Sequence, residues 1–379
     1  MKEAERPAIV VGYGARHAMA EIITLAERLK APVLTTFKAK GQIPDSHPHA
    51  AGVLGRSGTP IASWFMNEAD LMVAFGSSFS NHTGIYSYRK IVQVDFDRMA
   101  LGKFHPVTYP VWGEIATTAR LMLDQLNGAH QETTGEQTAN NDSSRVRLWH
   151  GTASAAPPAP AVTANTIAAT DQIPEIAERW RLWREEKQSR IADNLGSGIS
   201  SAAVFDELTR AAPANAVIAV DVGNNTYSFG RYFECKEQRV LMSGYLGSIG
   251  FSLPAAIGAW AATQDFPEHA ARKVISVSGD GGFGQYMAEL TTAVKYNMDI
   301  THILLNNAQL GKISKEQRAG QWPVWETSLH NPGFAAYARL CGAKGIRIID
   351  PADLAPAIAD AIAFSGPALV EIMTDAELV

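Results

Sequence analysis

Short apolar segments alternate with helix-like stretches along the first third of the chain, and this alternation limits the possible folds more than any other feature of the sequence. The apolar segments cover residues 8–11, 32–37, 70–75 and 90–96, and residues 19–30 repeat apolar side chains at helical spacing. Strands that alternate with helices in this way build parallel sheets. The first third of the chain therefore predicts an α/β domain.

A second series of the same kind begins at residues 217–221, after a change in composition. Residues 127–173 are rich in Ala, Thr, Ser, Pro and Gly and contain few large apolar side chains, which is typical of a linker. The later strands of this series are predicted at residues 273–278, 300–307, 345–349 and 367–373. We therefore expect an α/β protein with two doubly wound parallel-sheet domains, 1–126 and 174–379, joined by the long linker 127–173.

The composition excludes several classes of partner. The 379 residues have a net charge of -5 and show no basic stripe, so we expect no nucleic acid partner. No apolar run approaches the ~20 residues of a membrane span, and the N-terminal run is too short for a signal peptide, so we expect a cytoplasmic protein. Cys235 and Cys341 match no zinc or disulfide pattern, and we expect both to be reduced and structural.

The segment 278–307 contains the most specific chemical signal. Asp280 lies between glycines directly after one predicted strand, and Asn307 ends the next strand. Since the carboxyl ends of parallel strands meet at one edge of a sheet, both side chains should reach one site. Carboxylate and amide oxygens suit Mg²⁺, and the backbone N–H groups of residues without a Cβ can approach a diphosphate: Gly279, Gly281 and Gly282. The alternative is a simple strand-to-helix turn, which leaves the paired asparagines unexplained.

This segment resembles the cofactor motif of thiamine diphosphate (ThDP) enzymes, a family that includes 2-oxoacid decarboxylases, pyruvate oxidases and acetolactate synthases. Residues 246–259 and 221–225 are similar to that family's segments under the cofactor and beside its diphosphate. The resemblance implies that Asp280, the Asn307 side chain and the main-chain carbonyl of Gln309 hold Mg²⁺. The second domain would then be a ThDP diphosphate-binding domain.

The resemblance also assigns three positions to the cofactor itself. Ile249 matches the apolar residue that props ThDP in its bent form, and the carbonyl of Gly247 would accept from its 4'-amino group. Asn225 would lie near the diphosphate. For Ile249, core packing is the alternative explanation.

Other polar residues have ordinary structural explanations. Glu289 could serve as a general base, although a carboxylate within a helix usually forms a salt bridge or a cap. His302 and His330 are predicted to be structural. Residues 312–325 mix charge, Gly and Trp, and we expect either a mobile lid over the substrate or an amphipathic surface helix.

The first domain resembles the Rossmann-like central domain of the same family, which carries FAD in pyruvate oxidases and acetolactate synthases but not in other members. Residues 11–18 lack the full GxGxxG pattern, so FAD stays open. The implied flavin contacts, each of which packing could equally explain, are Gly12, Gly14, Gly55, Gly58, Ser77 and Asp95.

Full-length members of the family begin with a further domain that binds the aminopyrimidine and supplies an activating glutamate. No carboxylate in this chain maps onto that glutamate, so the catalytic group stays unassigned. Three explanations stay open. A separate pyrimidine-binding subunit supplies the glutamate, the chain is a truncated product, or the chain binds ThDP without turnover.

The resemblance implies a ThDP- and Mg²⁺-dependent enzyme, or its cofactor-anchoring part, in a homodimer or tetramer. It would decarboxylate a small 2-oxoacid such as pyruvate to an enamine, which is then transferred or oxidised. The alternative is a non-catalytic ThDP-fold protein or partner subunit.

Overall fold

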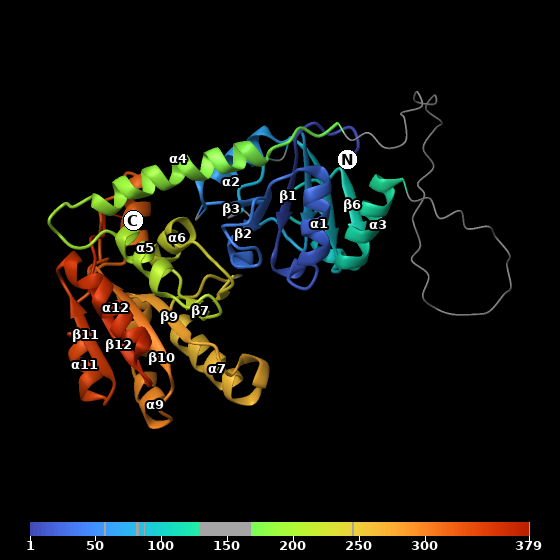
Figure 1. Ribbon diagram of the computed structural model, residues 1–379. Helices are drawn as coiled ribbons and strands as arrows, with labels where there is room; N and C mark the ends of the chain where they lie inside the picture. Colours follow the sequence, from blue (N-terminus) through green and yellow to red (C-terminus); the bar gives the residue numbers. More distant parts are fainter. Residues whose placement is uncertain (57, 81–82, 87, 129–167, 245, 379) are drawn as a thin grey trace.

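The computed structural model describes residues 1–56, 58–80, 83–86, 88–128, 168–244 and 246–378. It contains two six-stranded sheets, each entirely parallel and covered by helices on both faces (Figure 1). The predicted α/β class with two doubly wound domains is therefore confirmed. Most of the predicted linker, residues 129–167, lies outside the described residues, and the domain boundaries stay a prediction.

The first sheet has the strand order β3-β2-β1-β4-β5-β6. The chain adds β2 and β3 on one side of β1 and then crosses to add β4, β5 and β6 on the other side. Helices α1 and α3 pack on one face, and α2 packs on the other. The elements are β1 (Pro7–Val11), η1 (Tyr13–Ala15), α1 (Met19–Leu29), β2 (Val33–Thr36), η2 (Phe37–Ala39), β3 (Ala50–Leu54), α2 (Pro60–Glu68), β4 (Leu71–Phe75), β5 (Lys90–Asp95), η3 (Arg98–Ala100), β6 (Tyr109–Trp112) and α3 (Ile115–Asn127).

The second sheet has the order β11-β12-β10-β9-β7-β8. Helices α5, α6 and α12 cover one face, while α7, α8, α9 and α11 cover the other. The elements are α5 (Ser201–Ala211), β7 (Val217–Val220), α6 (Asn224–Tyr232), β8 (Arg239–Met242), α7 (Ser252–Asp265), η4 (Pro267–His269), β9 (Val274–Gly279), α8 (Asp280–Tyr286), α9 (Glu289–Lys295), β10 (Ile300–Asn306), α10 (Gly311–Ala319), α11 (Phe334–Leu340), β11 (Lys344–Ile348), η5 (Pro351–Asp353), α12 (Leu354–Ala363) and β12 (Ala368–Met373).

Strands β9 and β10 pair in the way that the sequence predicted. Leu305 lies opposite Gly279, so the two strands end side by side. The connection between them is not one continuous helix, because α8 ends at Tyr286 and α9 starts at Glu289. The carbonyl of Met287 accepts a hydrogen bond from the Tyr337 hydroxyl at 3.0 Å, at the point where the helix is interrupted.

Helix α4 (Ile173–Ala192) packs against both domains and runs along the top of the molecule in Figure 1. The Trp180 indole donates to the carbonyl of Ala50 in β3 at 2.7 Å, and Trp183 stacks on Tyr232 of α6 with 5.8 Å between ring centroids. Both indoles are buried. This helix therefore places its apolar face in a core that the two sheets share. Within the described residues, none of the helices is long and apolar enough to cross a membrane.

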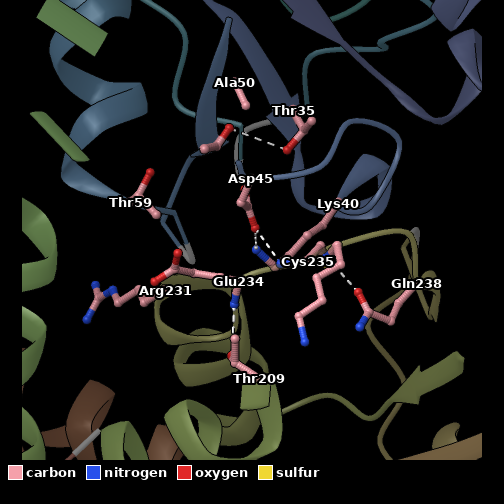
Figure 2. A network of polar contacts seen from close by, with 12 residues as sticks. Thr35, Lys40, Asp45, Ala50, Thr59, Thr209, Arg231, Glu234, Cys235 and Gln238 are labelled. Carbon is pink, nitrogen blue, oxygen red and sulfur yellow. Dashed lines mark hydrogen bonds and ion pairs between the residues drawn. The ribbon is translucent and has the colours of Figure 1, made fainter. Parts of the chain in front are cut away.

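A buried polar contact joins the two domains directly below β2 and β3 (Figure 2). Asp45 accepts from the Lys40 ammonium at 3.2 Å and from the backbone N–H of Cys235 at 2.7 Å. The backbone N–H of Asp45 donates in turn to the Cys235 carbonyl at 2.8 Å. Burial alone would lower the pKa of Lys40, but the Asp45 carboxylate raises it overall. The ion pair is thus part of the interface between the domains.

The cysteines are free thiols, as predicted. Cys235 is buried at the same interface, and burial raises the pKa of its thiol to about 12. The thiolate, which is the reactive form, is therefore scarce at neutral pH.

Replacing Asp45 should destabilise the protein because it leaves a buried ammonium without its carboxylate. We expect Asp45→Ala to lower the free energy of unfolding by about 3–5 kcal/mol. Glu185→Ala is the control, since it removes an exposed ion pair with Arg181 and should cost less than about 1 kcal/mol. Urea denaturation measures both, and equal losses would contradict a special role for Asp45 at the domain interface.

Candidate functional site

A cavity of about 290 Å³ lies at the carboxyl ends of the central strands of the second sheet. It is lined by backbone and side chains from the segments that follow β7, β9 and β10. The structure brings all nine predicted cofactor and metal residues to this one cavity: Asn225, Gly247, Ile249, Gly279, Asp280, Gly281, Gly282, Asn307 and Gln309.

Asp280 is the first residue of α8 and is only 3% exposed. Its Oδ2 accepts from the Asn331 amide at 2.7 Å, and its Oδ1 accepts from the backbone N–H of Gly281 at 3.0 Å. Burial raises the pKa of the Asp280 carboxyl, and these hydrogen bonds oppose that shift. Because a carboxylate oxygen has more than one lone pair, the group can still bind a cation in the cavity.

The turn after β10 presents two further oxygen ligands. Ala308 has a left-handed backbone (φ 52°), and the side chain of Asn307 accepts from the backbone N–H of Gln309 at 3.1 Å. Asn307 and Gln309 both line the cavity with Asp280. A carboxylate, an amide oxygen and a main-chain carbonyl form a hard donor set that fits Mg²⁺.

The backbone at Gly282 approaches a second buried carboxylate, that of Asp221. A Cβ at position 282 would lie 2.6 Å from Asp221 Oδ2. Asp221 is 1% exposed and accepts from the backbone N–H of Gly250 at 2.8 Å and from the Ser252 hydroxyl at 3.3 Å. Burial raises the pKa of Asp221, whereas its backbone donors lower it. Asp221 therefore bonds the end of β7 to the start of α7, directly after the loop that carries Gly247, and packs against Gly282 of α8.

The sequence analysis included Asp221 in the segment 221–225 but assigned no separate role to its side chain. The available signal was a carboxylate directly after the apolar strand 217–220, in the same position relative to its strand as Asp280.

The three residues assigned to the cofactor all line the cavity. Ile249 is 36% exposed and lines the cavity, so it is not a buried core residue. Gly247 has a left-handed backbone (φ 65°). The Asn225 side chain donates to the main-chain carbonyl of Asp221 at 2.9 Å. Their placement agrees with the predicted site, while their individual roles stay predictions.

Two further polar groups line the cavity and were missed from the sequence. Asn224 Nδ2 and Asp375 Oδ2 are buried and have no hydrogen-bond partner within the described residues. Buried polar atoms normally have partners, so these atoms can serve a polar ligand. Asn224 belongs to the segment 221–225 that the sequence analysis compared with the family's diphosphate-side loop, although its side chain was given no role there. Asp375 follows no recognisable motif and reaches the cavity from the C-terminal segment.

The other polar candidates lie away from the cavity lining. Glu289 is exposed and accepts from the Thr292 hydroxyl at 2.9 Å, and His330 is exposed. His302 is buried under α8 and contacts the Ser278 hydroxyl at 2.8 Å, and burial lowers the pKa of His302 to about 3. These positions agree with structural roles.

The predicted lid region contains helix α10 followed by coil. Lys312 and Ile313 line the cavity, whereas Trp322 and Trp325 are exposed by 68% and 72%. The structure thus places the start of this segment at the site, and its mobility stays a prediction.

In the first domain, the implied flavin contacts follow the carboxyl ends of β1, β3, β4 and β5. Gly12 and Gly14 also have a packing role, because a Cβ at Gly12 would lie 2.1 Å from the carbonyl oxygen of Gly76. Ser77 is buried, and burial raises the pKa of Asp95. Packing therefore accounts for the paired glycines without a ligand, and FAD stays a prediction.

Two models of the thiamine pyrophosphate enzyme family match the chain, the central domain over residues 1–122 and the C-terminal TPP binding domain over residues 221–372. The chain belongs to the thiamine pyrophosphate enzyme family. Thiamine pyrophosphate is another name for ThDP, and the second match covers all nine predicted residues at the cavity. The resemblance that the sequence motif indicated is confirmed.

The chain is similar to several curated members of this family. It is 33% identical over 375 residues to YdaP of Bacillus subtilis, whose name describes a putative thiamine pyrophosphate-containing protein. The alignment covers 98% of this chain and 57% of YdaP. It is 27% identical to acetolactate synthase isozyme 1 large subunit of Escherichia coli (99% of this chain, 59% of the relative). It is 28% identical to sulfoacetaldehyde acetyltransferase of Alcaligenes xylosoxydans xylosoxydans (100% and 62%). The chain thus spans about three fifths of the relatives' length.

The contact between Gly282 and Asp221 predicts a mutational effect. Gly282→Ala should lower the free energy of unfolding by about 1–3 kcal/mol, because the added methyl group overpacks the site and displaces the carboxylate. Gly284→Ala is the matched control in the same helix, since nothing lies within 4 Å of its Cβ, and it should be neutral or stabilising by up to ~1 kcal/mol. Thermal or urea unfolding distinguishes them, and equal effects would contradict the assigned contact.

Buried His302 predicts a pH dependence of stability. With a folded pKa of about 3 and an unfolded pKa near 6.5, the unfolded chain binds the extra proton between these values, so stability falls as pH falls. From pH 6.5 to 4.5 this group should cost the parent about 2–3 kcal/mol, which His302→Gln should remove. Urea unfolding at both pH values tests this, with exposed His330→Gln as the control. Identical pH slopes for parent and His302→Gln would refute it.

Proposed function

We propose that residues 1–379 form the cofactor-anchoring part of a ThDP- and Mg²⁺-dependent enzyme that acts on a small 2-oxoacid such as pyruvate. The observation that carries this proposal is the convergence of nine motif residues on one cavity. The family match, which names the same cofactor, supports it.

Asp280, Asn307 and the carbonyl of Gln309 would hold Mg²⁺. Because Gly281 and Gly282 have no Cβ, diphosphate oxygens could approach the backbone closely at these positions. When bound, ThDP supplies the electron sink that accepts the bonding electrons as a 2-oxoacid loses CO₂.

The chain's own residues would bind and orient the cofactor and shield it from water. Leu305, Leu310 and Ile313 form an apolar part of the cavity wall and exclude water. Asp221 holds the loop with Gly247 and Ile249 in place through its backbone hydrogen bonds. In this arrangement the fold supplies positioning, while a bound acceptor decides between transfer and oxidation. The synthase and acetyltransferase named among the relatives favour transfer to a second carbonyl compound.

The carboxylate that activates the cofactor is proposed to come from a pyrimidine-side domain or subunit. Within the described residues, the cavity is lined by two carboxylates, Asp280 and Asp375, and the first is assigned to the metal. Assembly as a homodimer or tetramer would bring such a domain to the cavity mouth. A ThDP-binding protein without turnover is the second candidate.

The first test is calorimetric titration of the chain with ThDP and Mg²⁺. Asp280→Ala should weaken Mg²⁺-dependent binding by more than ~100-fold, because loss of a direct ligand should exceed the ~10–100-fold effect of losing an outer partner. Glu289→Ala is the matched control, since this exposed carboxylate lies outside the cavity, and its affinity should equal that of the parent. Unchanged binding by Asp280→Ala would refute the site.

A pyruvate decarboxylation assay on the same sample separates the two candidate functions. Tight binding without CO₂ release is the expected result for the anchoring part alone, and addition of a pyrimidine-side domain of the family should then restore turnover. Failure of that addition would favour the non-catalytic alternative. Turnover by the chain alone would mean that one of its own groups activates the cofactor.

A further inference from the structure

A buried chain of hydrogen bonds runs from Asp280 to the far side of β10. The Asn331 amide nitrogen donates to Asp280 Oδ2 at 2.7 Å and to Asn306 Oδ1 at 3.0 Å. The Asn306 amide nitrogen donates to Glu371 Oε1 at 2.8 Å, and Glu371 Oε2 accepts from the backbone N–H of Ala335 at 3.0 Å. This chain connects α8, β10, β12, α11 and the segment before α11.

Each bond in this chain can point in only one direction. Ionised Asp280 and Glu371 have acceptor oxygens alone, so Asn306 must turn its nitrogen toward Glu371 and its oxygen toward Asn331. Asn331 must then supply both of its N–H bonds, one to Asp280 and one to Asn306. Its amide nitrogen therefore has no hydrogen left for another acceptor, and the two amides are held in one orientation.

The same chain also shapes the turn that carries the other cation ligands. Asn306 Oδ1 accepts from the backbone N–H of Ala308 at 3.2 Å, inside the turn between Asn307 and Gln309. Asn306 is 3% exposed and Glu371 is fully buried on β12, where it is paired to β10. A rigid, buried acceptor thus anchors Asn306, and Asn306 lies between Asp280 and the turn.

We propose that Asn331 is the positioning residue of the cation site, and that Glu371 sets its orientation through Asn306. The inference rests on the proposed Mg²⁺ function of Asp280, Asn307 and Gln309. Asn331 leaves the outward-facing lone pairs of Asp280 available and fixes the separation between Asp280 and the turn of residues 306–309. It acts through the ligands and does not bind the cation itself.

The relative affinities for Mg²⁺ and Ca²⁺ show whether Asn331 positions the cation ligands or only stabilises the fold. Mg²⁺ needs near-ideal octahedral geometry, while Ca²⁺ accepts irregular sites. Asn331→Ala should therefore weaken Mg²⁺ binding by about 10–100-fold, the usual effect of removing an outer partner, and weaken Ca²⁺ binding much less. The measurement is calorimetric titration of the full chain with MgCl₂ and with CaCl₂ at saturating ThDP.

His330→Ala is the matched control, since this exposed neighbour lies in the same segment and should bind both cations like the parent. Unchanged Mg²⁺ affinity in Asn331→Ala, or equal losses for both cations, would overturn the positioning role while the proposed function stands. Failure of the parent to bind either cation would overturn both. Circular dichroism without cation confirms that each variant is folded.

Glu371→Gln tests the far end of the chain without touching the cavity. The Asn306 amide and the Ala335 N–H donate to different oxygens of Glu371, and glutamine replaces one of these oxygens with an NH₂ group. One of the two donors would then face another donor. Mg²⁺ affinity should fall in the same direction as for Asn331→Ala, again more than Ca²⁺ affinity. Parent-like selectivity in Glu371→Gln would overturn the proposed role of Glu371.

Discussion

The parallel pairing of β9 with β10 is the constraint on which the functional part of the structure depends. The register sets Leu305 opposite Gly279, so the residues that follow each strand meet at one edge of the sheet. Both strands are almost completely buried, so a shift in register would expose apolar side chains or bury polar ones. Apolar packing in the sheet therefore decides where the oxygen ligands of the site lie, although it makes no contact with a ligand.

Buried carboxylates also fix the structure around the site, and their described partners are hydrogen-bond donors. Asp221, Asp280 and Glu371 each accept hydrogen bonds from backbone N–H groups, which compensate part of the cost of removing the charge from water. Asp221 and Asp280 directly follow the carboxyl ends of β7 and β9, and Glu371 lies within β12 opposite Leu304 of β10. The cavity walls are thus held by polar contacts whose directions are fixed, in contrast to the apolar contacts of the sheet.

Of the features that join the two domains, helix α4 could be predicted from the sequence and the Lys40–Asp45 pair could not. The Trp residues of α4 belong to a charged helical stretch whose apolar positions face the shared core, and the Lys40–Asp45 pair lies in loops that carry no motif. Strands β3, β6 and β8 were not predicted, and all three lie at sheet edges. An edge strand pairs on one side only, and β6 is largely exposed and even contains Pro110. β3 is buried, but it is short and contains Gly52.

The sequence by itself determined the α/β class, the central strands and the placement of Asp280, Asn307 and the neighbouring glycines at one site, because buried strands and strand-end glycines leave local patterns. The resemblance to the family added the other four residues that meet at the cavity: Asn225, Gly247, Ile249 and Gln309. Only the tertiary structure decided which distant groups hold those residues. Asn331 is 51 positions from Asp280 along the chain, and Glu371 is 65 positions from Asn306. Hydrogen bonds between such positions depend on the packing of several elements at once, and a linear pattern contains no record of that packing.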